Sequence, residues 1–290
     1  MLHPSAQHWS PAAALEEMDA ADISLSLLSV STPAASFLPP DAAAKLAREC
    51  NDYTAQLVQD YPGRFAIVGT LPMPHIEESL AELDYLYGKL NTAAIGLMTN
   101  YDQKWLGHPS FDRIFAALNE RHAAVHVHPS MTNPGVDAAR AMGLPPPVVE
   151  YSTDTTRTIA NLVFTGAAEK FTDVKLIFSH GGGTMPYLIE RFTGIARSNP
   201  QYAAFTAERV LAALRRFYYD VAIVAHPAPL AALTELIPAS QIVYGSDSPY
   251  RSPQATNEGI GSFLDQATLQ AILRDNSLRI MPSLKNIITD

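Results

Sequence analysis

The chain has 290 residues, of which 47% are hydrophobic and 17% charged, a composition typical of a globular protein with a substantial buried core. Its formal net charge of −9 and the lack of any basic run exclude nucleic acid and anionic membranes as expected partners. A single cysteine, Cys50, excludes an intrachain disulfide, and we expect a cytoplasmic protein with neither a secretory signal nor a membrane span.

Short apolar segments alternate with longer helical patterns along the chain. The predicted strands are Ile23–Val30, Phe65–Leu71, Ala93–Met98, Ala123–His128, Val174–Ser179, Phe217–Ala222 and Gln241–Gly245. The predicted helices are Pro11–Ala20, Asp41–Asp60, Ile76–Leu90, Ser110–His122, Thr155–Lys170, Met185–Arg197, Ala203–Arg215, Pro229–Ile237, Ser262–Arg274 and Asn276–Leu284. This repeated order of strand and helix predicts one α/β domain over residues 1–290, built on a parallel sheet with right-handed crossovers.

Polar side chains gather where the predicted strands end. Asn100 follows the third strand, His128 ends the fourth, His180 follows the fifth and Asp247 follows the seventh. In a (β/α) barrel the carboxyl ends of the strands form the rim of the active site. The pattern therefore predicts that these side chains meet at one end of the sheet.

The stretch AVHVHPS, residues 124–130, places two histidines on one strand. Residues i and i+2 of a strand share a face, so His126 and His128 point to the same side. The pair could chelate one metal ion, but we favour a hydrogen-bonded core role for His126, which lies one layer deeper. His128, at the carboxyl end of the strand, is the better placed for chemistry.

Two further stretches carry candidate chemistry. In FSHGGGTMPYLIERF, residues 178–192, His180 leaves an apolar strand and meets three glycines, which allow a tight turn and a close approach to a ligand. In IVYGSDSPYRSP, residues 242–253, Asp247 can bind a metal or move a proton. Arg251 either clamps a substrate carboxylate or is a solvated surface arginine. His226, just beyond the sixth strand, is a weaker candidate.

These stretches, with DTTRTIANLVFTG, FYYDVA and ILRDNSLRIMPSL, follow the order and spacing of one family. The chain resembles the amidohydrolase-related decarboxylases typified by aminocarboxymuconate semialdehyde decarboxylase, which include enzymes acting on γ-resorcylate, carboxyvanillate and 6-methylsalicylate. WSPAAALEEMDAADISLSLLSVSTP and LMTNYDQKWLGHPSFDRIFAALNER match as well, so the resemblance covers nearly the whole chain.

The resemblance implies a (β/α)8 TIM barrel, one divalent metal ion (zinc or manganese), no organic cofactor, and a homodimer. By position, His128 resembles the family's metal-binding histidine, and Asp247 resembles the aspartate that binds metal and takes part in proton transfer. His180 resembles the histidine that handles protons. Arg251 and Asn100 are the predicted contacts to the substrate.

The chain departs from the family at its beginning. The family starts with a strand bearing His-x-His, and here Trp9-Ser10-Pro11 already belongs to the segment that follows it. The seven predicted strands agree with a missing first strand, and His3 and His8 are too far apart to replace the pair. We expect either a shortened chain or a natural variant with a depleted metal site, with two strand edges left open.

These observations predict a metal-dependent, non-oxidative carboxy-lyase that acts on an aromatic or unsaturated carboxylic acid. Two alternatives remain open. A metal-dependent hydrolase of a lactone, ester or amide would use the same residues with His180 positioning a water. A metal-poor, catalytically inactive paralogue would explain the missing His-x-His.

Overall fold

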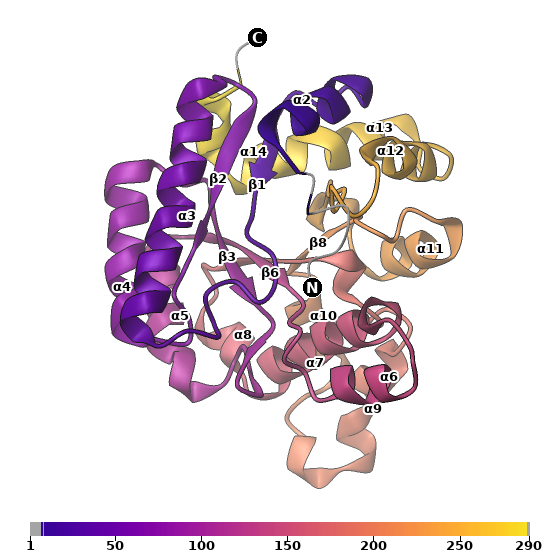
Figure 1. The fold of residues 1–290 in the computed structure, drawn as a ribbon. Coiled ribbons are helices and arrows are strands. Elements are labelled where there is room, and N and C mark those ends of the chain that lie inside the picture. Colours follow the sequence, from indigo (N-terminus) through magenta and orange to yellow (C-terminus); the bar gives the residue numbers. More distant parts are fainter. Residues whose placement is uncertain (1–6, 8, 289–290) are drawn as a thin grey trace.

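Seven parallel strands form one sheet whose spatial order follows the chain order (Figure 1). The computed structural model describes residue 7 and residues 9–288. The strands are β1 (Ser26–Leu28), β2 (Phe65–Thr70), β3 (Ala94–Met98), β6 (Ala124–His128), β7 (Lys175–Phe178), β8 (Tyr218–Asp220) and β9 (Ile242–Val243). Every predicted strand is present, although β1, β8 and β9 are markedly shorter than expected.

The sheet curls into a half-barrel that its own strands do not close. β1 and β9 are the outer strands, and no other strand in the described part of the chain pairs with their free edges. This arrangement confirms the predicted barrel type with seven strands.

Most of the helices follow the strands and cover the convex face of the sheet (Figure 1). The α-helices are α2 (Pro11–Ala20), α3 (Pro40–Asp60), α4 (Ile76–Tyr85), α5 (Asp112–Glu120), α6 (Gly135–Ala141), α7 (Glu150–Phe164), α8 (Ala167–Lys170), α9 (Ile189–Ser198), α10 (Ala207–Leu214), α11 (Pro227–Leu236), α12 (Pro253–Gly261), α13 (Gln266–Gln270) and α14 (Asn276–Ile280). Shorter 3-10 or π turns are η1 (Leu86–Leu90), η2 (Pro109–Phe111), η3 (Pro146–Val148), η4 (His180–Gly182), η5 (Pro200–Tyr202), η6 (Ala239–Gln241), η7 (Ala271–Asp275) and η8 (Pro282–Asn286). Among the described residues, none of the helices has the length and apolar character needed to cross a membrane.

Two helices lie where the sequence indicated only loops. Helix α12 begins at Pro253, and helix α6 follows Pro134 with Gly135 as its first residue. Proline reads as a loop signal, yet its fixed φ suits the first turn of a helix and its missing N–H has no partner to lose there. Helix α9 is shorter than predicted because the chain forms turns up to Leu188.

A small hairpin also escaped prediction. Strands β4 (Asn100–Tyr101) and β5 (Lys104–Trp105) pair antiparallel directly after β3. The two residues between them, Asp102 and Gln103, have φ of 50° and 59°. Left-handed values at both central positions are the mark of a type I′ turn, which the pair Asp-Gln does not signal as Asn-Gly would.

The two faces of the sheet differ in character. The large apolar core lies between the sheet and the outer helices and includes Leu97, Val125 and Phe178. The concave face carries smaller side chains such as Ala94 and Ala124, and residues of α14 and η8 pack against them. Because side chains alternate along a strand, the face that carries Ala124 also carries His126 and His128.

Candidate active site

A cavity of about 650 Å³ occupies the concave side of the sheet and reaches the carboxyl ends of the strands. Its walls include His126, His128, His180, Asp220 and Asp247. Apolar side chains of β1, β2 and β9 line its depth. Among the described residues that line it there is no lysine or arginine.

His128 ends β6 and offers one free ring nitrogen to the cavity. Its Nδ1 lies 2.9 Å from the carbonyl oxygen of Pro129. A carbonyl oxygen only accepts, so Nδ1 carries the proton and Nε2 keeps its lone pair. Burial, with the neighbouring His180 and His126, lowers the pKa of His128 from 6.5 to about 4. The imidazole is therefore held neutral, the form that binds a metal ion.

His180 follows β7 in a left-handed backbone conformation, with φ of 56°. Its main-chain N–H donates to Oδ1 of Asp220 at 2.8 Å, and its Nε2 lies 3.6 Å from Oδ2 of Asp247. Burial by itself lowers the pKa of His180, but the carboxylates of Asp247 and Asp220 outweigh it and raise that pKa above its ordinary value. His180 is thus set up to hold a proton where His128 is not.

Asp247 follows β9 and is likewise left-handed, with φ of 64°. Its carbonyl oxygen accepts the N–H groups of Tyr250 and Arg251, which closes a tight turn. Left-handed backbone at a non-glycine residue costs on the order of 1–2 kcal/mol, and such strain is concentrated at functional sites. Two of the predicted site residues, His180 and Asp247, carry it.

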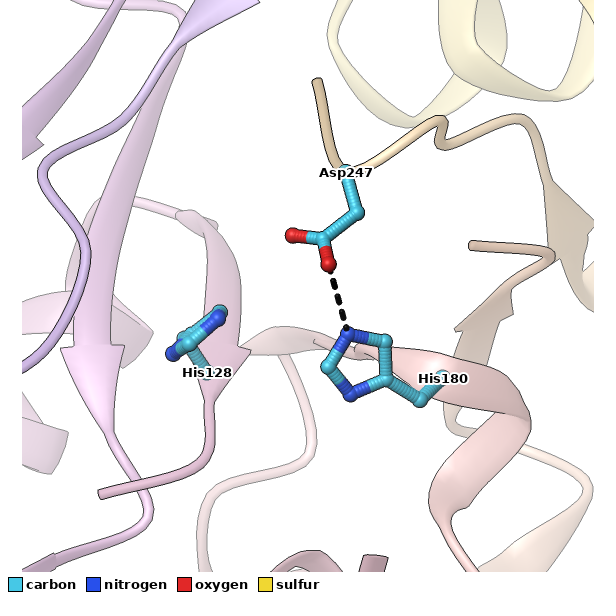
Figure 2. Close-up of side chains that lie close together, drawn as sticks. All are labelled: His128, His180 and Asp247. Atoms are coloured by element: carbon cyan, nitrogen blue, oxygen red, sulfur yellow. Dashed lines mark ion pairs between the residues drawn. The ribbon is translucent and has the colours of Figure 1, made fainter. Parts of the chain in front are cut away.

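Figure 2 shows the side chains of His128, His180 and Asp247 converging from three strand ends. One ligand atom of each lies within 4.8 Å of the others. Nε2 of His180 is buried and has no partner at hydrogen-bond distance, its nearest charged neighbour being the Asp247 carboxylate at 3.6 Å, so a bound substrate or water could still accept from it. The Nε2 atom of His128 and a carboxylate oxygen of Asp247 are ligand types that suit zinc or manganese, so these residues fit a divalent ion, with Nε2 of His180 beside them.

The glycines after His180 pack closely against neighbouring elements of the chain and do not face the cavity. A Cβ on Gly182 would lie 2.7 Å from Cε1 of Tyr219, and one on Gly183 would lie 2.1 Å from the carbonyl oxygen of Ser152. The turn is thereby packed between β8 and α7. The expected tight turn is present, and its glycines hold His180 in place.

His126 does not join the metal-binding group of the described residues. Its Nε2 lies 3.5 Å from Oδ2 of Asp220, and its side chain is 25% exposed. The expectation of a core histidine was therefore wrong in one respect, because His126 forms part of the cavity wall. Asp220, a further polar residue at the end of a predicted strand, the sixth, links this wall to the backbone of His180.

Asp154 on α7 is a second residue that sequence reasoning missed. Its fully buried carboxylate accepts hydrogen bonds from Thr99 Oγ1, from Trp105 Nε1 at 2.7 Å and from the N–H of Ser130 at 3.2 Å. It thus anchors the loop that follows His128. Its signal in the sequence is its place as the first residue of DTTRTIANLVFTG, one of the stretches that carry the family resemblance.

Asn100 and Arg251 lie away from the cavity walls. The amide of Asn100 donates to Asp154 at 2.9 Å and accepts from Thr132 at 3.0 Å, and the side chain is buried. The Nε atom of Arg251 is buried without a hydrogen-bond partner. Their predicted contacts to a substrate stay predictions.

The remaining histidines named above do not enter the site. His226 caps α11, with its Nδ1 accepting the N–H of Ala228 at 3.3 Å. His3 and His8 lie outside the described residues.

Comparison with known proteins agrees with this geometry. The chain is 32% identical to the decarboxylase yanB of Aspergillus niger, over 96% of this chain and 81% of that protein. It is 32% identical to the 6-methylsalicylic acid decarboxylase acuB of Aspergillus aculeatus, over 91% and 83% respectively.

A solved structure shares the fold. It is a dihydroxybenzoic acid decarboxylase from Polaromonas sp. JS666 with bound manganese and the inhibitor 2-nitroresorcinol, with a TM-score of 0.84 and 19% identity over 93% of this chain and 85% of that one. The amidohydrolase family model matches residues 2–282. By its sequence, its parallel half-barrel and its strand-end site, this chain belongs to the amidohydrolase family.

Proposed function

We propose that this protein is a metal-dependent, non-oxidative decarboxylase of an aromatic acid that carries a hydroxyl group beside the carboxylate, as in 6-methylsalicylate. The observation that carries the proposal is the group formed by His128, His180 and Asp247 on the cavity wall. The two relatives at 32% identity, both decarboxylases, support the type of reaction.

His128 and Asp247 would hold the metal, with zinc or manganese as the candidates. A bound divalent ion supplies a Lewis acid and template for the substrate carboxylate and its neighbouring hydroxyl. The neutral state of His128 keeps its Nε2 available as a ligand down to low pH. Since lysine and arginine are absent from the described walls, the protein's own contacts to an anionic substrate would come from the imidazoles and from hydroxyl groups that line the cavity, such as those of Ser29 and Ser31.

His180 would deliver the proton. In the step, a proton passes from Nε2 of His180 to the ring carbon that bears the carboxylate. The bond between that carbon and the carboxylate then breaks, its electron pair restores the aromatic ring, and CO2 leaves. Water from the open end of the cavity restores the proton on His180, so the reaction consumes one proton for each CO2 released.

The site's position also supports an aromatic substrate. The cavity has polar side chains at the strand ends and apolar walls formed by Leu27, Val68, Ile177 and Val243. A planar ring bound at the rim can bury its unsubstituted edge against these walls, which favours aromatic over extended aliphatic acids.

The proposal includes a cytoplasmic homodimer. Cytoplasmic location rests on the single cysteine, and the dimer rests on the resemblance to a family in which dimers are usual.

The decisive experiment measures metal content and CO2 release together. Purified protein and its His128→Ala variant are analysed by plasma mass spectrometry and then incubated with 6-methylsalicylate and with 2,6-dihydroxybenzoate. We expect about one zinc or manganese per chain, lost in the variant, with release of CO2 and the matching phenol. Metal without CO2, but with hydrolysis of an aryl ester, would replace the decarboxylase by a hydrolase. No metal in either protein would overturn the proposal for this chain.

A further inference from the structure

A second hollow, of about 530 Å³, lies at the opposite end of the sheet from the candidate active site. It is formed where the chain enters β7, β8 and β9, and its walls include Lys175, Arg215, Arg216 and Gln241. The face of a barrel at the amino ends of its strands is remote from catalysis, so this hollow is a site of its own.

The cationic side chains in this hollow are held by main-chain oxygens. Nζ of Lys175 donates to the carbonyl of Ile280 at 2.9 Å, and Nε of Arg215 donates to that of Leu236 at 3.1 Å. Arg216 donates in the same way to a carbonyl of helix α8. A neutral carbonyl orients such a group but leaves its full positive charge uncompensated.

Arg279 adds a fourth cation at the edge of the hollow. It donates to the carbonyl of Ser240 and lies 3.4 Å from the hydroxyl of Tyr218, and both of these residues line the hollow. Its guanidinium carbon lies 5.8 Å from the centre of the Tyr218 ring. Arg279 therefore has no carboxylate partner in these contacts.

Carboxylates are scarce around these four cations. None of the four takes part in an ion pair among the described residues, whereas other basic residues of the chain do, for example Arg121 with Asp84 at 2.6 Å and Lys170 with Asp112 at 2.7 Å. Asp173 is the one acidic residue in the hollow's walls.

Two contacts show how the acidic groups nearby are used. Asp173 has an oxygen 3.9 Å from Nδ1 of His122. Glu169 forms its ion pair with Arg209, at 2.6 Å, and this pair is the main cause of its lowered pKa. The charge of the nearby Arg216 lowers that pKa further, but the two residues form no ion pair. In a chain with net charge −9, the hollow is a local excess of positive charge.

We propose that this hollow binds a multiply charged oxyanion of the phosphate type. Guanidinium groups match phosphate oxygens with paired hydrogen bonds, and Lys175 supplies a compact point charge beside them. A singly charged carboxylate would leave most of the cations uncompensated. A bound anion would also link the residues before β7, β8 and β9 to Arg279 of α14, whose neighbours pack against the concave face of the sheet. Binding would therefore stabilise the folded chain.

The test is isothermal titration of the purified protein with inorganic phosphate, pyrophosphate and glycerol phosphate at constant ionic strength, with chloride as the reference. We expect saturable binding of one anion per chain, pyrophosphate tighter than phosphate, and a rise in melting temperature on binding. An Arg215→Gln, Arg216→Gln double variant should bind at least about tenfold more weakly, a loss of about 1.4 kcal/mol, since it removes two of the four positive charges. Tighter binding of inorganic phosphate than of glycerol phosphate would indicate a free phosphate as the ligand, and the opposite order would indicate a phosphate ester.

Controls separate this site from the cavity and from unfolding. Lys104→Gln removes one exposed charge from β5 and should bind the anion as tightly as the wild type does. The Arg215→Lys, Arg216→Lys variant keeps both charges, and its affinity should lie between those of the wild type and the Arg215→Gln, Arg216→Gln variant. Binding that survives in the Arg215→Gln, Arg216→Gln variant and disappears in His128→Ala would place the anion in the cavity and overturn the proposal. Absence of saturable binding, or tighter binding of citrate than of pyrophosphate, would overturn it as well. None of these readouts depends on decarboxylase activity.

Discussion

Two buried histidines 5.8 Å apart, measured between ring centres, are tuned in opposite directions. His128 is kept neutral chiefly by burial, with a pKa lowered to about 4, whereas the pKa of His180 is raised by two carboxylates that outweigh its burial. Groups with pKa values pushed apart are typical of sites that divide ligand and proton-transfer roles. The difference leads to two predictions at the scale of single residues.

The first concerns stability and pH in protein freed of metal with a chelator. Unfolded His128 takes up a proton near pH 6.5 but the folded side chain does so only near pH 4. Its contribution to stability is therefore complete above pH 6.5 and is lost as the pH falls towards 4. We expect the free energy of unfolding, measured with urea, to fall over this range, and the fall to be smaller in His128→Gln. Parallel pH curves for the two proteins would contradict the pKa assigned to His128.

The second concerns the division of roles between the histidines. His180→Gln should retain the metal and lose about 10²–10⁴-fold in kcat, because it removes the proton donor and spares the ligands His128 and Asp247. His226→Gln, a change at a helix cap remote from the cavity, is the matched control and should leave kcat unchanged. Loss of metal together with activity in His180→Gln would make His180 a ligand and not the proton donor.

At the scale of elements, the turn between β7 and α9 shows why three glycines follow His180. Gly183 has φ of 69° and no room for a Cβ, while Gly143 after α6 has φ of 72° and open space around it. Gly143→Ala should therefore lower the free energy of unfolding by only about 1 kcal/mol, the cost of holding an alanine in left-handed backbone. Gly183→Ala adds a clash with the main chain of Ser152 and should cost at least about 3 kcal/mol. Urea unfolding of both variants checks this, and equal losses would show that α7 shifts to accept the new methyl group.

At the scale of the whole molecule, an exposed apolar segment marks the expected contact between two copies. Met142, Leu144, Val148 and Val149 are exposed by 66%, 44%, 67% and 49%, within one stretch between α6 and α7. Contiguous exposed apolar side chains on a soluble chain typically mark a protein interface. The stretch leads into Tyr151, whose ring centre lies 6.3 Å from that of His128. A second copy packed on this stretch would therefore help to hold His128 in position.

We therefore expect light scattering to give twice the chain mass of 31.5 kDa. A Met142→Lys, Val148→Lys variant should be monomeric, since it places charges in the apolar contact. Phe37→Lys, at a residue 65% exposed elsewhere on the molecule, should remain dimeric. A wild-type chain that runs as a monomer would remove the dimer from the proposed function.

Local patterns were enough to predict all seven strands of the main sheet, because buried strands form apolar runs that do not depend on distant residues. Helix α2 begins and ends where its pattern predicts, from Pro11 to Ala20. Helices α6 and α12 were missed because glycine and proline near a helix start resemble loop signals. The β4–β5 hairpin was missed because its turn residues carry no glycine.

The sequence by itself determined the parallel architecture, the family resemblance and the strand ends that bear His128, His180 and Asp247. Only the tertiary structure decided that these three meet within 4.8 Å while Asn100 and Arg251 lie off the cavity. It also decided that His126 pairs with Asp220, and that Lys175 lies beside Arg215 and Arg216 in one hollow. Identity and periodicity are local properties of the chain, whereas distance, burial and the field of neighbouring charges arise only when strands far apart in sequence pack side by side.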